Sequence, residues 1–149
     1  MREEVKGAGQ SEEQTPELIR KAAEHGDADA QRNLGVMYET GDGVEQSYEQ
    51  AVEWYRKAAE QGDAVGQGCL GVMYYNGAGV EQSYEQAVEW WRKAAEQGDA
   101  IAQFNLGLMY ANGDGVEQNF EQAVEWYRKA AEQGYADAQS RLGFMYESG

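Results

Sequence analysis

A stretch of 36 residues recurs in register along the chain, and no other feature restricts the fold as strongly. The full copies are residues 27–62, 63–98 and 99–134, and a fourth copy begins at residue 135 and is still incomplete at Gly149. A fixed period of this size is typical of proteins that stack one small helical or mixed unit many times. Since such a unit buries its apolar side only against its neighbours, the sequence predicts an elongated array.

Each copy predicts two helices joined by a glycine-rich loop. In the first copy we expect a helix from about Ala28 to Glu39 after an N-cap at Asp27, and a second helix starting at Ser47. The pair Ser47 and Gln50 predicts a capping box, which recurs at Ser83 and, in a weaker form, at Asn119. Each second helix ends in KAAEQG or KAAEHG, and the final glycine fits the left-handed residue that closes many helices. These glycines are Gly26, Gly62, Gly98 and Gly134.

The expected fold class is therefore all-α: a right-handed α-α superhelix, or solenoid, of helix-turn-helix repeats with a 36-residue period. Residues 1–14 are polar, and we expect them to be a flexible acidic lead-in. Thr15 and Pro16 predict the start of a helix, so residues 15–26 form an N-terminal capping half-repeat. The remaining divisions are repeats 1 to 3 at 27–62, 63–98 and 99–134, and an incomplete repeat 4 at 135–149.

The repeated pattern A-x-A-Q-x-x-L-G-x-M-Y-x-x-G-x-G-V, followed by A-x-x-W-Y-x-K-A-A-E-x-G, resembles the Sel-one-like repeats, which are relatives of the tetratricopeptide repeats. The resemblance extends from about Thr15 to Gly149. It implies an all-helical superhelix that serves as an adaptor or scaffold for other proteins, without naming a partner. Two departures are visible. Glu45, Glu81 and Glu117 follow the loop valine where many family members have proline, and the paired cysteines of a secreted branch are absent.

The chain has a net charge of −15, and its acidic residues are spread over all copies. Without a basic patch, nucleic acid and anionic membrane surfaces are poor partners. No apolar run approaches the roughly 20 residues that span a bilayer. The first residues lack the apolar segment of a secretory signal, and a lone Cys69 fits a reducing compartment. We therefore expect a cytoplasmic location.

Comparison of the copies separates two sides of the first helix. Positions such as Leu34, Gly35 and Tyr38 barely change and form the packed side. Other positions, also three or four apart, differ from copy to copy. In related solenoids the first helices line the concave surface, so this variable side predicts a groove. Its residues are Asp29, Arg32, Asn33, Val36 and Glu39, then Val65, Gly68, Cys69, Val72 and Tyr75, then Ile101, Phe104, Asn105, Leu108 and Ala111, and finally Asp137, Ser140, Arg141, Phe144 and Glu147.

The middle of this groove is apolar and its ends are charged, as in many binding surfaces. The side chains that we expect to bind a peptide are Asn33, Val65, Val72, Tyr75, Ile101, Phe104, Asn105, Leu108, Arg141 and Phe144. The apolar members could anchor peptide side chains, and the asparagines could bond a peptide main chain. The alternative is that they pack against neighbouring first helices, which periodicity alone does not distinguish.

Other conspicuous residues favour structural interpretations. Trp54, Trp90 and Trp126 recur unchanged and are better explained by packing than by ligand stacking. Cys69 lacks the electropositive setting of a reactive thiol, and His25 has no Cys or His cluster for a metal. The loop near Asn112 lacks the glycine that a calcium loop needs. We find no nucleophile motif, no triad and no phosphate loop, and we expect no catalytic residue, cofactor or metal.

The function that we favour is a non-catalytic scaffold or adaptor that binds a peptide or a partner segment in the concave groove. One alternative is an engineered or purely structural repeat array without a natural ligand, which the near-identity of the copies would suit. Another is a hydrolase of unrecognised mechanism, although no unrepeated polar cluster supports it. We also expect weak self-association through the C-terminal edge, because the fourth copy lacks its second helix there.

Overall fold

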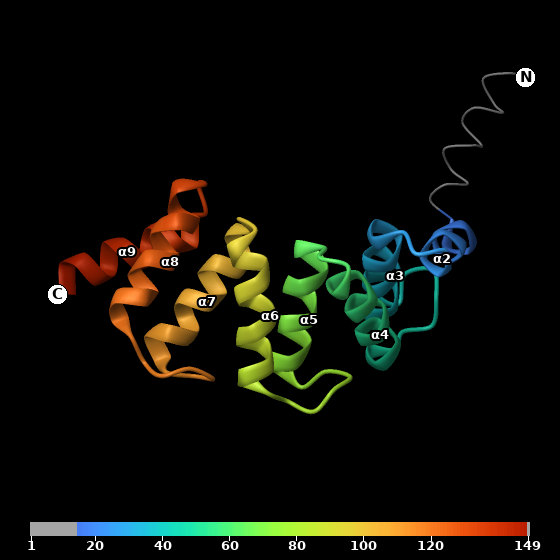
Figure 1. The fold of residues 1–149 in the computed structure, drawn as a ribbon, viewed down its shortest axis with the longest axis horizontal. Helices are drawn as coiled ribbons and strands as arrows, with labels where there is room; N and C mark the ends of the chain where they lie inside the picture. The colour runs from blue at the N-terminus through green and yellow to red at the C-terminus, as the bar shows by residue number, and fades with distance from the viewer. Residues whose placement is uncertain (1–14, 149) are drawn as a thin grey trace, which may run out of the picture.

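The computed structural model describes residues 15–148, and within this range the chain forms helices and connecting loops with no strand. The helices follow one another along an elongated body, with α2 at one end and α9 at the other (Figure 1). Their bounds are α2 Pro16–Glu24, α3 Ala28–Thr40, α4 Tyr48–Glu60, α5 Ala64–Asn76, α6 Tyr84–Glu96, α7 Ala100–Asn112, α8 Phe120–Glu132 and α9 Ala136–Ser148. The predicted lead-in, residues 1–14, lies outside the described residues.

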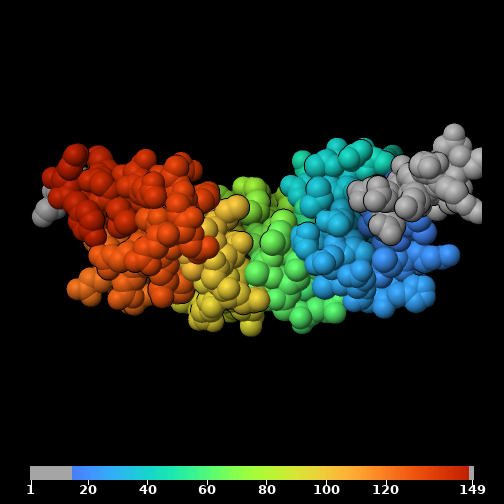
Figure 2. Space-filling view, turned by 90° about the horizontal axis from the view of Figure 1, so that it is seen from above, coloured from blue at the N-terminus to red at the C-terminus, as the bar shows by residue number. Residues whose placement is uncertain are grey.

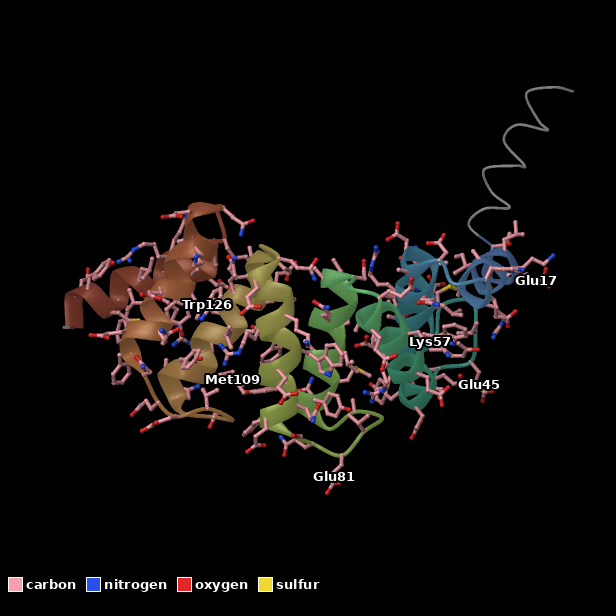
Figure 3. The ribbon with its side chains drawn as sticks, in the orientation of Figure 1. Glu17, Glu45, Lys57, Glu81, Met109 and Trp126 are labelled. Carbon is pink, nitrogen blue, oxygen red and sulfur yellow. The ribbon has the colours of Figure 1, made fainter. Side chains whose placement is uncertain are left out.

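Each helix packs chiefly against the helices that precede and follow it in the sequence, and the most extensive contacts are α3 with α4, α5 with α6 and α7 with α8. This confirms the predicted all-α right-handed solenoid of helix-turn-helix units. The space-filling view shows the same elongated body, which is narrowest at the green and yellow residues in its middle (Figure 2). In the loops between paired helices, the labelled Glu45 and Glu81 point away from the body (Figure 3).

The predicted capping box is only half formed. The hydroxyl of Ser47 accepts a hydrogen bond from the N–H of Gln50 at 3.2 Å, as expected of an N-cap. The N–H of Ser47 donates instead to the carbonyl oxygen of Tyr38 at 2.8 Å, so it is not available to the Gln50 side chain. The later copies repeat this bond at Ser83 and Asn119. The reciprocal half of the prediction was wrong because the loop returns the chain to the end of the preceding helix.

The glycines that end the second helices have the predicted left-handed conformation, with φ of 100°, 97°, 102° and 90°. After α4, the N–H of Gly62 donates to Ala59 and the N–H of Asp63 donates to Ala58. These two bonds form a Schellman motif, which satisfies the last carbonyl groups of the helix. Asp63 then serves as the N-cap of α5, so one short turn closes one unit and begins the next.

Close packing within a unit depends on a glycine opposite an aromatic ring. A Cβ added at Gly35 would lie 2.6 Å from the ring of Tyr55, and one at Gly107 would lie 2.6 Å from the ring of Tyr127. A glycine inside a helix costs about 1 kcal/mol relative to alanine. Here that cost allows the two helices to approach, and the rings of Tyr55 and Tyr127 become almost fully buried.

Two glutamines in each unit connect consecutive units. Gln67 is 4% exposed, and its amide donates to the carbonyl oxygen of Ala59 at 3.1 Å. Its own side-chain oxygen accepts from Gln97 at 2.9 Å, and Gln97 also donates to the carbonyl of Gly62 at 2.9 Å. The same arrangement joins Gln31 with Gln61 and Gln103 with Gln133. The repeated glutamines therefore satisfy buried polar groups across the boundary between units.

Each of the three recurring tryptophans packs against a lysine of its own helix. Each is partly buried, and a lysine ammonium lies over each indole ring at 5.7 to 5.9 Å from the ring centre. The lysine stands three residues further along the same helix, so these pairs are cation–π contacts within one helix turn. Such contacts agree with the packing interpretation of Trp54, Trp90 and Trp126.

Candidate functional site

The variable side of the first helices contains two adjacent pockets between α5 and α7. The first has a volume of about 300 Å³ and is lined by Val72, Tyr75, Asn76, Trp91, Asn105, Leu108, Met109 and Asn112. The second has a volume of about 170 Å³ and is lined by Val65, Gly68, Cys69, Val72, Trp91, Asp99, Ile101, Ala102 and Asn105. We call the first the tyrosine pocket, the second the glycine pocket, and the two together the groove.

Three residues belong to both pockets: Val72, Trp91 and Asn105. Trp91 is 4% exposed and reaches the groove from α6, below the two first helices. Its indole N–H donates to the carbonyl oxygen of Gly68 at 3.1 Å, which fixes the ring. Tyr75 packs over it with ring centres 5.7 Å apart. In an extended chain every second side chain points to the same face. Two adjacent pockets over a fixed aromatic ring can receive two such side chains, and the asparagine shared by both pockets can bond the main chain between them.

Six of the ten predicted site residues lie together in this groove. They are Val65, Val72, Tyr75, Ile101, Asn105 and Leu108. Ile101 is 54% exposed and Val65 is 47% exposed, so large apolar side chains face solvent at this place. The alternative of ordinary core packing therefore does not describe these two residues, although their role in binding stays a prediction.

The other four predicted residues lie elsewhere. The partly buried ring of Phe104 lies between Tyr127 and Tyr135, with ring centres 5.6 and 5.3 Å away. Asn33 lies next to Arg32, from which its side-chain oxygen accepts a hydrogen bond at 3.3 Å. Arg141 and Phe144 are exposed on α9, Phe144 by 67%. Phe104 is thus part of an aromatic cluster, while the apolar centre of the groove surrounds Trp91.

Cys69 lies at the edge of the glycine pocket with its thiol in a protected setting. Burial raises the pKa of Cys69 to about 11, and the nearby Glu39 carboxylate contributes in the same direction. Glu39 accepts a hydrogen bond from the hydroxyl of Tyr55 at 2.5 Å, and burial together with this bond raises the pKa of Tyr55. The thiol is neutral at pH 7 and fills space in the groove, because only the thiolate is a strong nucleophile.

Sequence comparison alone did not identify Trp91, Asp99, Asn76 or Asn112 as groove residues. Trp91 occupies a position that is tyrosine in the other full copies, and the exchange of one aromatic residue for another does not by itself indicate a groove residue. The signal that could have found it is the glycine at position 68, where the other full copies have large side chains. A tryptophan and a glycine that depart from the pattern in one copy indicate a local change of shape.

No metal centre is formed by the part of the chain that the structure describes, since no three His, Cys, Asp or Glu side chains gather there. The polar groups of the groove are the side-chain amides, the Asp99 carboxylate, the Tyr75 hydroxyl, the Trp91 indole N–H and the neutral Cys69 thiol. These groups can bind through hydrogen bonds and charge, and they do not form a nucleophile with an adjacent base.

Sel1 repeats match the chain at residues 28–63, 70–99, 100–135 and 136–149. The chain belongs to the Sel1 repeat family. Proteins with Sel1 repeats are generally protein-interaction scaffolds without catalytic activity. None of the curated proteins compared with this chain matches it.

Solved structures agree with this assignment. The protein c5321, described as a protective antigen present in uropathogenic Escherichia coli strains with an SLR fold, is 44% identical with a TM-score of 0.86. A Sel1 repeat protein from Oxalobacter formigenes is 41% identical with a TM-score of 0.84. Cysteine-rich protein B of Helicobacter pylori is 26% identical with a TM-score of 0.68.

The matches cover 89%, 89% and 85% of this chain, respectively. They cover 28% of c5321, 53% of the Oxalobacter protein and 96% of the Helicobacter protein. The Sel1 repeats described here therefore span well under two thirds of the first two of these proteins. None of the helices within residues 15–148 combines the length and apolar character that crossing a bilayer requires.

Proposed function

We propose that this Sel1 repeat chain is a non-catalytic interaction module that binds an extended segment of a partner protein in the groove between α5 and α7. The observation that carries this proposal is the pair of pockets that share Val72, Trp91 and Asn105. Each pocket can receive one apolar or amphipathic side chain, and the Asn105 amide offers both a donor and an acceptor to the main chain between them.

The uneven composition of the groove favours a binding role over a purely structural array. A structural array needs only the positions that pack units together, and those are nearly identical in all copies. The glycine pocket exists in the second unit because Gly68 and Trp91 depart from the pattern there. Exposed Ile101 and Val65 add apolar surface that stacking does not use. The hydrolase alternative has no nucleophile and base pair in the groove to support it.

A peptide display library selected against the purified chain tests this proposal. The selected peptides are then titrated, as synthetic fluorescent peptides, against Ile101→Glu and Phe120→Glu variants. Ile101 is 54% exposed in the groove, and Phe120 is 57% exposed at the start of α8, away from both pockets. We expect at least tenfold weaker binding for Ile101→Glu and unchanged binding for Phe120→Glu. Equal affinity for both variants would contradict the groove.

We also propose weak self-association through the uncovered side of α9. Phe144 and Tyr146 are 67% and 60% exposed there, and a Cβ added at Gly143 would meet no atom within 4 Å. The equivalent glycine of the first unit faces the ring of Tyr55. Sedimentation velocity over a range of concentrations should show a dimerising chain, and Phe144→Glu should make it monomeric. A chain that stays monomeric at millimolar concentration would refute this second proposal.

A further inference from the structure

One position of the first helices faces the N-cap of the next first helix and differs in every unit. In the first unit Arg32 occupies it, and its guanidinium Nε lies 3.0 Å from Oδ2 of Asp63. The same guanidinium contacts Asp29 at 2.7 Å. Arg32 is only partly exposed, so its side chain fills the space between α3 and α5 and ends on a carboxylate.

The third unit fills the same position with an aromatic pair. Phe104 stands where the first unit has Arg32, and Tyr135 stands where it has Asp63. Their ring centres are 5.3 Å apart. In both units, therefore, the side chain of the first helix and the residue at the next N-cap position are matched to one another, by charge in one case and by ring packing in the other.

The second unit retains the carboxylate but has no side chain facing it. Gly68 replaces the arginine, and Asp99 occupies the position of Asp63. A Cβ added at Gly68 would have only Asp99 Oδ2 within 4 Å, at 3.9 Å. The space that Arg32 fills in the first unit is here the glycine pocket of about 170 Å³. The first unit thus has an arginine side chain beside the N-cap carboxylate, whereas the second unit has a pocket beside the equivalent carboxylate.

Asp99 can accept a guanidinium in the manner that Asp63 does. Asp63 Oδ2 accepts the N–H of Gly66 at 2.8 Å and still accepts Nε of Arg32. Asp99 Oδ2 accepts the equivalent N–H, that of Ala102, at 2.9 Å. A carboxylate oxygen has two lone pairs and both oxygens remain charged, so Asp99 has acceptor capacity directed at the pocket.

We infer that the glycine pocket binds an arginine side chain supplied by the partner segment, an inference that rests on the proposed function of the groove. The apolar stem of that arginine would lie against Val65, Val72 and Ile101, its guanidinium on the Asp99 carboxylate and next to the Trp91 indole. Tryptophan is the aromatic side chain that attracts a cation most strongly. An arginine suits the site better than a lysine because its planar group stacks and bonds a carboxylate through two N–H groups.

The size and charge of the protein agree with this ligand. An engineered apolar cavity of roughly 150 Å³ holds a benzene ring, so a pocket of about 170 Å³ accommodates a guanidinium with its short stem. The net charge of −15 draws a cationic segment toward the surface. The partner that this chemistry recognises is a segment with an arginine flanked by apolar residues.

The test uses N-acetyl-arginine amide as the probe and follows the indole N–H of Trp91 by NMR. We expect a saturable shift of this signal, and at least tenfold weaker binding of N-acetyl-citrulline amide, which has the same shape without the charge. Gly68→Arg should abolish probe binding and raise the melting temperature, because the new side chain reproduces the pairing of Arg32 with Asp63. Undiminished binding by the Gly68→Arg variant would overturn the inference.

Two asparagine variants provide the matched comparison. Asp99→Asn retains a good N-cap for α7 but removes the charge, and we expect at least tenfold weaker binding of the arginine probe. Asp63→Asn makes the same change at the position that Arg32 already fills, and should leave probe binding unchanged. Equal loss in both variants, or equal binding of the arginine and citrulline probes, would refute an arginine site.

The test of the arginine site can fail or succeed independently of the test of the peptide-binding groove. Display-selected peptides that bind the chain and its Gly68→Arg variant equally would overturn the arginine site while leaving the groove proposal intact. Conversely, saturable binding of the arginine probe that Asp99→Asn abolishes, without any selected peptide that depends on Ile101, would support the pocket and contradict the wider groove.

Discussion

The indole N–H of Trp91 donates a hydrogen bond to the backbone carbonyl oxygen of Gly68, 3.1 Å away, and thereby connects the floor of the groove to its open wall. Neither Tyr55 nor Tyr127, at the same position in the other units, can make this bond with its ring. A Cβ added at Gly68 would have only Asp99 Oδ2 within 4 Å, so position 68 opens toward α7 while its carbonyl oxygen bonds Trp91 of α6. The two residues of the second unit that depart from the repeat, Gly68 and Trp91, are therefore bonded to one another and line the same pocket.

A first prediction concerns the glycine that accommodates this ring. A Cβ at Gly71 would lie 2.6 Å from Cδ1 of Trp91, whereas one at Gly143, the same position in the fourth unit, would meet nothing within 4 Å. Gly71→Ala should therefore destabilise the chain by about 1–3 kcal/mol, as overpacked cores do. Gly143→Ala should stabilise it, by up to about 1 kcal/mol, through helix propensity.

Chemical denaturation of Gly71→Ala and Gly143→Ala measures the two changes in unfolding free energy, and the substitution is the same at both positions. A loss of similar size at both positions would show that the uncovered side of α9 is filled in solution, contrary to the structure. A gain at Gly71 would show that Trp91 moves freely.

A second prediction follows from an unpaired hydroxyl in the third unit. The hydroxyl of Tyr55 donates to Glu39, but Tyr127, which is 1% exposed, has no hydrogen-bond partner for its hydroxyl among the described residues. Ala111 stands where the first unit has Glu39. Ala111→Glu should supply the missing acceptor and stabilise the chain by about 1 kcal/mol.

Thermal unfolding of Ala111→Glu is compared with that of Ala111→Leu, which adds a side chain of similar length without an acceptor. Only the glutamate variant should melt at a higher temperature. A similar rise in both would attribute the gain to covered apolar surface and not to the hydroxyl of Tyr127.

A third prediction tests the glutamines that join the units. In Gln97→Leu the buried side-chain oxygen of Gln67 and the carbonyl of Gly62 both lose their donor. Since a buried polar group without a partner costs about 1–3 kcal/mol, we expect a destabilisation of that size by urea denaturation. Gln50→Ala is the control, because Gln50 is exposed and its predicted capping bond is absent. The loss of stability in this control should stay within about 0.5 kcal/mol. A larger loss would indicate that the Gln50 side chain does form the predicted capping bond.

A fourth prediction concerns Cys69 and pH. With a pKa raised to about 11 by burial, the thiol is almost entirely protonated at pH 8, and the thiolate fraction grows about tenfold for each unit of pH up to that pKa. Alkylation by iodoacetamide, followed by mass spectrometry, should be far slower than for glutathione at pH 8 and should accelerate steeply toward pH 11. The chain unfolded in urea should react at the ordinary rate. Fast alkylation of the folded chain at pH 8 would contradict the buried setting.

The helices and their ends were predictable because the signals are local. Asp27, Ser47 and the closing Gly62 each act on backbone groups within a few residues, so a single copy contains the information. The bonds from Gln97 to Gln67 and Gly62 connect residues 30 and 35 positions apart. The first bond lies within the unit 63–98 and the second reaches the preceding unit, and the repeated pattern does not distinguish the two because both recur with the same period.

The groove was predictable only in outline for a related reason. The variable side of the first helices contains Val72, Ile101 and Asn105, which line one pocket in the structure. The pockets, however, also require Trp91 from a second helix and Asp99 from a turn. Their volume depends on what is missing at Gly68, and no pattern of side chains on one helix reports an empty space.

The last prediction removes the second unit. Deletion of residues 63–98 joins Gly62 to Asp99, and the turn sequence at the junction is unchanged because Gly98 also precedes Asp99. We propose these boundaries as the unit of stacking, so the shortened chain should remain helical by circular dichroism. It should unfold at lower denaturant concentration, since one stacking interface is lost.

Arg32 would then face Asp99 as it faces Asp63 in the intact chain. The deletion removes Gly68 and Trp91 and closes the space between the remaining first helices, so the variant should fold and yet fail to bind groove-selected peptides. An unfolded product would contradict the solenoid, and a folded product that still binds those peptides would place their site outside the groove.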